Sequence, residues 1–154
     1  MTTFLPSKDL LLEACAGTVD SAHPLLRAAY ELASLHEARD AAAPEAMHEI
    51  DCARVQLIRD IDRWTAHELP RPFAAAALHT ETLGMVVDRL ARFSVDAHTA
   101  LETGDTECGL HRAWTRLAEL SLAYAELSHD LTARTRRIPD FITTHPEDLQ
   151  HQQF

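Results

Sequence analysis

The sequence predicts an all-α protein, an up-down antiparallel four-helix bundle preceded by a short extra helix. Four glycines in 154 residues are too few for a sheet protein rich in tight turns, and the helix-favouring residues Ala, Leu, Glu and Arg are abundant. Four long segments also carry apolar residues three and four positions apart, as on one face of a helix. Because short connections join these segments, neighbouring helices should run antiparallel.

One domain is expected over residues 1–140, followed by a mobile tail over residues 141–154 that has no apolar stripe. With 46% apolar residues, the chain can bury a core without disulfides or metals. The short first helix should begin after Ser7, a suitable N-cap, and end at Gly17.

The four long helices are expected near residues 22–40, 45–69, 77–102 and 106–136. Pro24 suits the first turn of the first of these, and Pro70 ends the second because proline cannot continue a helix. Thr80 or Thr82 should cap the third, and Gly104 follows its end. Asp105 or Thr106 should cap the fourth, which stops before Ile138-Pro139.

The charge excludes two classes of partner. A formal net charge of −10, with arginines interleaved among acids, repels phosphate backbones and anionic lipid, so neither nucleic acid nor membrane is expected as a partner. The cysteines Cys15, Cys52 and Cys108 are odd in number and far apart, which favours free thiols in a reducing compartment. No signal peptide or spanning segment is recognisable, so we expect a cytoplasmic protein.

The most informative segment is the stretch from Arg54 to Trp64. Its apolar stripe consists of Ile50, Leu57, Ile58, Ile61 and Trp64, with Gln56, Arg59, Asp60 and Arg63 pointing away. Arg54 and Asp62 fall among the apolar residues. Charges in that position need partners, so they indicate either a buried structural network or a functional site.

Residues equidistant from a loop should lie at similar heights in an antiparallel bundle. Folding about residue 72 places Asp62 level with Glu81 and Thr82, and Arg54 within one turn of Asp88 and Arg89. Folding about Gly104 brings Tyr124 to the same half of the bundle. Two interpretations stay open, a salt-bridged network that fixes helix register, and a pocket for a polar ligand or for catalysis.

Several segments resemble the domain of unknown function 4254 family, which is bacterial and largely actinobacterial. The resemblance covers about residues 7–140 and rests on HPLLRAAYELASLHEARD, RVQLIRDIDRW, LHTETLGMVVDRLA, RLAELSLAYAELSHDL and RRIP. It implies a helical fold and supplies no mechanism. Its polar pattern implicates Glu37, Arg54, Asp62, Glu81, Thr82, Gly84, Asp88, Arg89 and Tyr124. The chain departs from the pattern at His48, Asp51 and Ala125, where the family often has Asp, Asn and Asp.

Two functions from different classes are compatible with these residues. The first is a non-enzymatic module that binds a small polar molecule or a partner protein. The alternative is an acid–base isomerase, cyclase or lyase, without a cofactor, acting on a small polar or carboxylate-bearing substrate. The candidate catalytic residues are Asp62, Glu81 and Asp88, and the candidate binding residues are Arg54, Arg89, Thr82, Tyr124 and Glu37. The opening is expected between the second and third long helices, where Asp62, Glu81 and Arg89 should converge near Pro70–Pro72.

No metal site is expected, although the sequence contains a pattern that suggests one. Glu45-x-x-His48 and Glu126-x-x-His129 match the ligand spacing of di-iron bundles, but the height argument separates them by roughly 25 Å. Histidines at one bundle end, His36, His48, His98 and His111, are expected to be ordinary surface residues.

The third long helix carries a strip of small residues, Gly84, Ala91 and Val95. The strip permits close helix approach, either within the chain or in a homodimer. The two tryptophans, Trp64 and Trp114, are expected to anchor the core.

Overall fold

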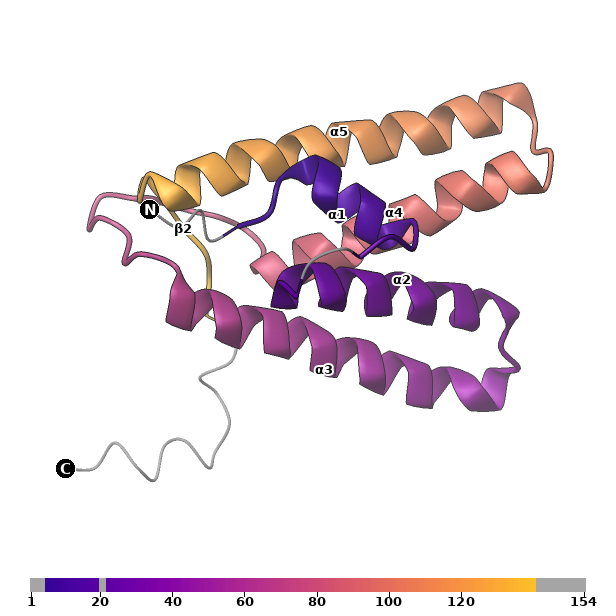
Figure 1. Ribbon diagram of the computed structural model, residues 1–154, viewed down its shortest axis with the longest axis horizontal. Helices are drawn as coiled ribbons and strands as arrows, with labels where there is room; N and C mark the ends of the chain where they lie inside the picture. The colour runs from indigo at the N-terminus through magenta and orange to yellow at the C-terminus, as the bar shows by residue number, and fades with distance from the viewer. Residues whose placement is uncertain (1–4, 20–21, 141–154) are drawn as a thin grey trace.

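The computed structural model describes residues 5–19 and 22–140 and confirms an all-α protein (Figure 1). The elements in these ranges are α1 (Lys8–Cys15), α2 (Pro24–Ala41), α3 (Pro44–Glu68), β1 (Ala77–Leu78), α4 (Leu83–Glu102), α5 (Glu107–Thr132) and β2 (Arg136–Arg137). The predicted tail, 141–154, lies outside the described residues. No helix in the described ranges has the length and apolar content to cross a bilayer.

Side-chain caps fix the starts of α1, α4 and α5 as the sequence predicted. The Ser7 hydroxyl accepts the Leu10 N–H at 3.2 Å, and the Thr82 hydroxyl accepts the Met85 N–H at 3.2 Å. The Thr106 hydroxyl accepts the N–H of the residue three positions on at 3.0 Å. Each cap supplies a partner to an amide that the first helical turn leaves without one.

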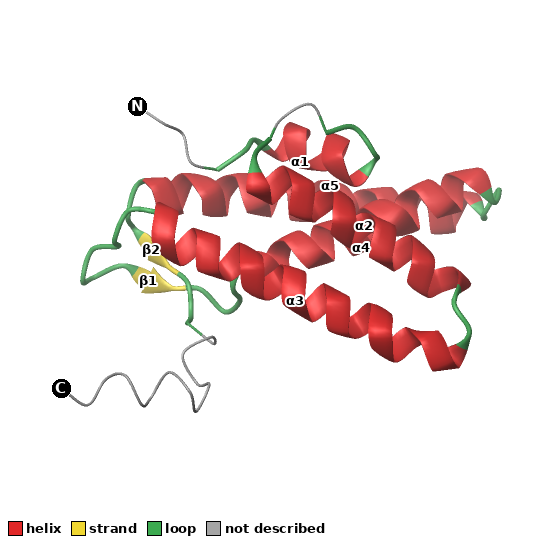
Figure 2. Cartoon of the chain, turned by 60° about the horizontal axis from the view of Figure 1, so that its bottom comes forward, coloured by secondary structure: helices red, strands yellow, loops and turns green. Residues whose placement is uncertain are grey.

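Two predicted helix boundaries are wrong, and for the same reason. The third long helix begins at Leu83 instead of residue 77, and the fourth ends at Thr132 instead of residue 136. The residues in question form a two-stranded parallel sheet that pairs Ala77 with Arg136 (Figure 2). The backbone at Arg134 turns to φ 66°, which ends α5 and allows the chain to enter β2.

The sheet ties the α3–α4 connection to the chain that leaves α5. Ala77 N–H donates to Thr135 O at 3.2 Å, and His79 N–H donates to Arg137 O at 2.8 Å. Nearby, Phe73 N–H donates to Arg134 O at 3.0 Å. Two segments about sixty residues apart in the sequence are therefore hydrogen-bonded to each other at this end of the molecule.

Helix α4 is the centre of the fold. It contacts α1, α2, α3 and α5, whereas no contact joins α5 to α2 or α3 in the described part of the chain. The short α1 lies between α2 and α5 and contacts both (Figure 1). The four-helix up-down bundle is therefore not confirmed as a closed ring, because α1 occupies the place where α2 and α5 would meet.

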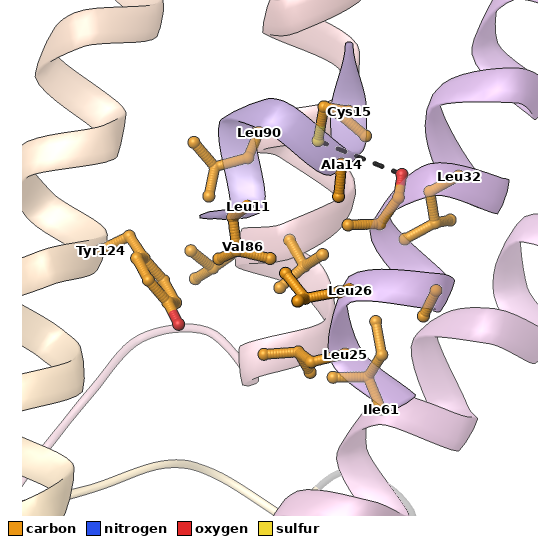
Figure 3. Packing of buried hydrophobic residues seen from close by; sticks show 14 of the residues in the cluster. Leu11, Ala14, Cys15, Leu25, Leu26, Leu32, Ile61, Val86, Leu90 and Tyr124 are labelled. Carbon is orange, nitrogen blue, oxygen red and sulfur yellow. Dashed lines mark hydrogen bonds between the residues drawn. The ribbon is translucent and has the colours of Figure 1, made fainter. Parts of the chain in front are cut away.

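The core forms where α1, α2, α4 and α5 converge. Leu11, Leu25, Val86 and Leu90 are buried there, and Tyr124 approaches them from α5 (Figure 3). Burial of this much aliphatic surface is the main favourable term in a fold that has no disulfide among its described cysteines.

Two buried polar groups pin α1 and the segment before it to that core. The Tyr124 hydroxyl donates to Pro6 O at 2.6 Å, and burial raises the pKa of the phenol. Cys15 lies 4.0 Å from the Ala29 carbonyl oxygen, and burial raises the pKa of its thiol to about 12. That thiol is therefore held in its unreactive, protonated form.

Helices α3 and α4 approach closely at Gly84. A Cβ at this position would lie 2.4 Å from the Ile58 carbonyl oxygen and 2.8 Å from an Asp62 carboxylate oxygen. Ala91 and Val95, which continue the small-residue strip, are also buried. The strip thus serves packing within the chain, and the homodimer stays a prediction that would need another surface.

The tryptophans differ in their surroundings. Trp64 is partly buried against the core and meets His23 edge to face, with ring centroids 5.1 Å apart. Trp114 is 38% exposed and contacts His98, with ring centroids 5.2 Å apart. The prediction that Trp114 anchors the core is therefore wrong, because its side chain is exposed and does not pack against the core cluster.

Candidate functional site

The predicted polar residues divide between two hollows. The first is a cavity of about 400 Å³ at the β1–β2 end, hereafter the Asp62 cavity. The second is a shallower hollow of about 320 Å³ over α2, α3 and α4. The two hollows differ in how their charged groups are paired, and this pairing decides whether each can bind a charged ligand.

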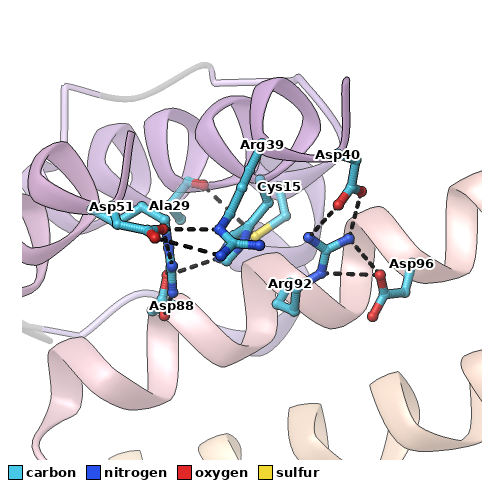
Figure 4. A network of polar contacts seen from close by, with 10 residues as sticks. Cys15, Ala29, Arg39, Asp40, Asp51, Asp88, Arg92 and Asp96 are labelled. Atoms are coloured by element: carbon cyan, nitrogen blue, oxygen red, sulfur yellow. Dashed lines mark hydrogen bonds and ion pairs between the residues drawn. The ribbon is translucent and has the colours of Figure 1, made fainter. Parts of the chain in front are cut away.

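An arginine–aspartate cluster underlies the second hollow, formed by His36, Arg39, Asp51, Arg54 and Asp88 (Figure 4). Arg54 donates to both oxygens of Asp88, at 3.2 and 2.7 Å, and to Asp51 at 3.0 Å. Arg39 Nε donates to Asp51 at 2.9 Å, and His36 Nε2 lies 2.8 Å from Asp88 Oδ1. The cluster thus joins α2, α3 and α4 through one chain of charge-assisted hydrogen bonds.

The pairing of Arg54 with Asp88 confirms the contact that the sequence predicted. The side chains of Arg54 and Asp88 are 22% and 14% exposed. Burial alone would raise the pKa of Asp88, but the hydrogen bonds from His36 and Arg54 outweigh it and hold the pKa below its usual range. Asp88 is therefore an anion already bound to protein donors, which leaves it poorly suited to accept a substrate proton.

The remaining arginines of the second hollow are paired as well. Arg92 forms a bidentate pair with Asp40, at 3.0 and 2.7 Å, and its Nε donates to Asp96 at 3.0 Å. Arg89 pairs with Glu81. Since each arginine that lines this hollow has a carboxylate, the arrangement matches a network that fixes helix register.

Asp62 has a different environment, at the point where α3 meets the start of α4. Its Oδ1 accepts the Gly84 N–H at 2.7 Å, and the neighbouring Thr82 hydroxyl also stabilises the charged carboxylate. Burial raises the pKa of Asp62, only partly offset by these two donors, and the charge of Asp140 raises it further. No ion pair joins Asp62 to a cation within the described residues.

The same cavity contains cationic residues from two distant segments. Arg71 follows α3, and Arg136 and Arg137 form β2. The guanidinium of Arg71 has neither a hydrogen bond nor an ion pair among the described residues. Arg136 reaches Asp130 at 3.3 Å, and Arg137 Nε donates to Ala76 O at 3.1 Å.

Apolar side chains complete the lining of the Asp62 cavity. They are Leu69, Pro70, Pro72, Leu131, Ile138 and Pro139, together with Ala66 and the threonines Thr65 and Thr82. A concave site of a few hundred Å³ with apolar walls and a few charged groups has the form of a small-molecule site.

The structure separates residues that the sequence placed at one opening. Asp62 and Thr82 line the Asp62 cavity, whereas Glu81 and Arg89 line the second hollow. The predicted convergence of Asp62, Glu81 and Arg89 is therefore wrong. The reason is local, because Glu81 precedes the N-cap of α4 and pairs with Arg89 over the second hollow, whereas Thr82 lines the other cavity.

Two other candidates lie apart from both hollows. Tyr124 is buried in the core, and Glu37 is exposed on α2. The cationic lining was not predicted, because the sequence separates Arg71 from Arg136 by more than sixty positions. The available signal was the run Arg134-Thr135-Arg136-Arg137, a local concentration of positive charge in an acidic chain.

The histidines do not gather around a common point, and the expectation that His36 is a surface residue is wrong, because it is buried beside Asp88. His48 lies beside Cys52, at 3.6 Å, and His98 Nδ1 lies 2.7 Å from its own helix at Ser94 O. Within the described ranges, no group of three or more His, Cys, Asp or Glu side chains is placed to hold a metal ion.

These features define a helical protein with a paired ionic network between α2, α3 and α4 and a charged, partly apolar cavity at one end. The chain belongs to the family described as protein of unknown function (DUF4254), whose model matches residues 21–139, and this confirms the resemblance read from the sequence. Searches of the curated proteins and of the solved structures found no match.

Proposed function

We propose that the protein is a small-molecule binding module and that its ligand, which carries a carboxylate on a partly apolar body, occupies the Asp62 cavity. The observation that carries this proposal is Arg71, an exposed residue that lines the cavity and whose guanidinium has no anionic partner among the described residues. A guanidinium that has no protein carboxylate can bind one from a ligand in bidentate fashion.

The arginine–aspartate cluster is a weaker candidate for the same role. An anion that entered the second hollow would have to displace Asp88 from Arg54, or Asp40 from Arg92, and leave a carboxylate unpaired. The Asp62 cavity requires no such exchange. The β1–β2 pair also holds Arg136 and Arg137 on a hydrogen-bonded strand, which limits the loss of freedom when a ligand binds.

Thermal shift measurements with 4-methylpentanoate and 3-phenylpropanoate test the proposal. Each should raise the midpoint of unfolding of the wild-type protein in a concentration-dependent way, since a ligand that binds the native state stabilises it. Arg71→Ala should remove most of this increase without lowering the midpoint of the free protein, because Arg71 has no partner to lose. Arg59→Ala, an exposed arginine of α3 outside both hollows, is the control. An equal increase in all three proteins would contradict the proposal.

The acid–base enzyme is the second candidate, and one observation favours it. Asp62 combines a raised pKa with a position in the same cavity as Arg71, so that a carboxylate substrate could be held by the arginine while Asp62 exchanges a proton. In this version the base is Asp62, since Glu81 pairs with Arg89 in the second hollow. Asp62→Asn should then abolish turnover and leave the fold intact, whereas Glu81→Gln should retain activity.

The free cysteines support a proposed cytoplasmic location. Cys15 is buried, and Cys52 and Cys108 are exposed without a disulfide partner among the described residues. Exposed free thiols fit a reducing compartment.

A further inference from the structure

We infer that the ligand of the Asp62 cavity is a zwitterion, whose carboxylate binds Arg71 and whose cationic nitrogen binds Asp62. The inference rests on the proposed binding function and deepens it by naming the class of ligand. The proposed function names only the carboxylate of the ligand, and the inference adds a positive charge.

Asp62 stands out among the acids at the helix interfaces because it lacks a cation. Each of the comparable acids has an arginine partner, and they are Asp40, Asp51, Asp88, Asp96 and Glu81. Asp62 is held only by neutral donors, the Gly84 amide and the Thr82 hydroxyl. Burying a carboxylate without a counter-ion costs free energy. Asp62 therefore destabilises the fold, and a cationic group bound beside it would offset that loss.

The neighbourhood of Asp62 strengthens this argument. Asp140 lines the same cavity and acts on Asp62 as a like charge. A cationic nitrogen near the two carboxylates would reduce their repulsion. Although three arginines line the cavity, none forms an ion pair with Asp62 among the described residues. The cavity therefore presents an anionic region and a separate cationic region, and an ordinary carboxylate ligand would use only one of them.

The position of Asp62 is fixed before a ligand arrives. Gly84 allows α4 to approach α3 so closely that its amide reaches Asp62 Oδ1 at 2.7 Å, and the Thr82 hydroxyl at the N-cap of the same helix also stabilises the carboxylate. A carboxylate held in this way is preorganised to accept hydrogen bonds from an ammonium group. The apolar residues between the charged groups suit the side chain of an amino acid or a similar body.

Matched sets of probes test the inference by isothermal titration calorimetry of the full chain. L-leucine, 4-methylpentanoate and 3-methylbutan-1-amine share the same isobutyl side chain and carry both charges, only the carboxylate, or only the amine. L-phenylalanine, 3-phenylpropanoate and 2-phenylethylamine repeat the comparison with a larger body. In at least one set the zwitterion should bind about ten times more tightly than the carboxylate, which corresponds to one additional charge-assisted contact.

Asp62→Asn identifies the residue responsible. This variant keeps a side-chain oxygen for the Gly84 amide, and it should bind the zwitterion and the carboxylate equally, with the affinity for the carboxylate unchanged or increased. The control is Asp60→Asn, an exposed acid two positions away on α3, which should preserve the tenfold preference.

The outcomes separate the inference from the proposed function. Carboxylates that bind as tightly as the zwitterions would overturn the inference and leave the carboxylate site in place. A preference for the zwitterion that survives Asp62→Asn would also overturn it, since the nitrogen would then bind elsewhere. Failure of every zwitterion and carboxylate to bind would overturn both the inference and the proposed function.

Discussion

Gly84 links the packing of α3 and α4 to the position of Asp62. A methyl group at this residue would meet the Ile58 carbonyl oxygen at 2.4 Å, and a backbone atom inside a helix cannot move aside as a side chain can. Gly84→Ala should therefore lower the free energy of unfolding by about 2–3 kcal/mol, measured by urea denaturation.

Gly109→Ala is the control for this prediction. The three atoms nearest to a Cβ at Gly109 all belong to the Asp105 side chain, which can rotate away, so the variant should be no less stable than the wild type. Equal stability of the two variants would show that α3 and α4 do not approach as closely as described.

Arg54 should be required for the stability of the fold. Arg54→Ala removes both hydrogen bonds to Asp88 and leaves that carboxylate with His36 alone, which should cost about 3 kcal/mol. Arg63→Ala, which breaks an exposed pair with Asp60 on the same helix, should change stability by less than about 0.5 kcal/mol. Similar small losses for both variants would mean that the arginine–aspartate cluster does not fix helix register.

Asp62 and Asp88 should respond to pH in opposite directions. The pKa of Asp88 is lowered in the folded state, so its contribution to stability is present above its unfolded pKa of about 3.9 and is lost as pH falls through the folded pKa. The pKa of Asp62 is raised, so stability declines as pH rises from about 3.9 through its folded pKa.

Thermal denaturation between pH 3 and 7 measures the difference. At pH 7, Asp88→Asn should lower the midpoint, whereas Asp62→Asn should leave it unchanged or raise it. Any increase in the midpoint caused by Asp62→Asn should become smaller as the pH falls towards 4. The decrease caused by Asp88→Asn should become smaller only below pH 4. Loss of stability at pH 7 in Asp62→Asn as large as in Asp88→Asn would contradict the view that Asp62 is retained for ligand binding and not for the fold.

At the scale of elements, the sequence predicted the helices well because their signals are local. Thr82 and Thr106 act as the N-caps that were expected, and Pro44 and Pro70 bound α3. The strands could not be predicted, since β1 and β2 have two residues each and depend on a partner about sixty positions away. The place of α1 was missed for a similar reason. Its local pattern predicts a helix but does not indicate that this helix lies between α2 and α5.

Amide hydrogen exchange by NMR tests the strand pairing. In a parallel pair, alternate residues direct their amides towards the partner strand. The amides of Ala77 and His79 donate to Thr135 and Arg137, so both should exchange slowly, whereas the intervening Leu78 amide should exchange quickly. Rapid exchange at all three positions would show that β1 is unpaired and that Arg136 and Arg137 are not held beside Arg71.

At the scale of the whole molecule, half of the candidate site was predictable. Asp62 and Thr82 were found because a charge on an apolar helix face and an N-cap are both visible in a local pattern. The arginines of the cavity were missed because contacts between distant segments, the β1–β2 pair and the bond from Arg134 to Arg71 O, bring Arg71 and Arg137 to the same end of the fold. Glu81 and Arg89 were assigned to the wrong hollow, since height along a helix does not specify the direction of a side chain.

The central claim is that the Asp62 cavity binds the ligand while the arginine–aspartate cluster holds the helices together. Nitrogen-15 NMR during a titration with L-leucine tests both parts in one experiment, through the Gly84 amide, which donates to Asp62, and the arginine Nε signals. The account predicts saturable shifts of Gly84 and Arg137 Nε, which lie at the cavity, and unchanged signals from Arg54 Nε and Arg92 Nε, which donate to Asp88 and Asp96. Shifts of Arg54 and Arg92 with an unchanged Gly84 would contradict it and place the ligand in the second hollow.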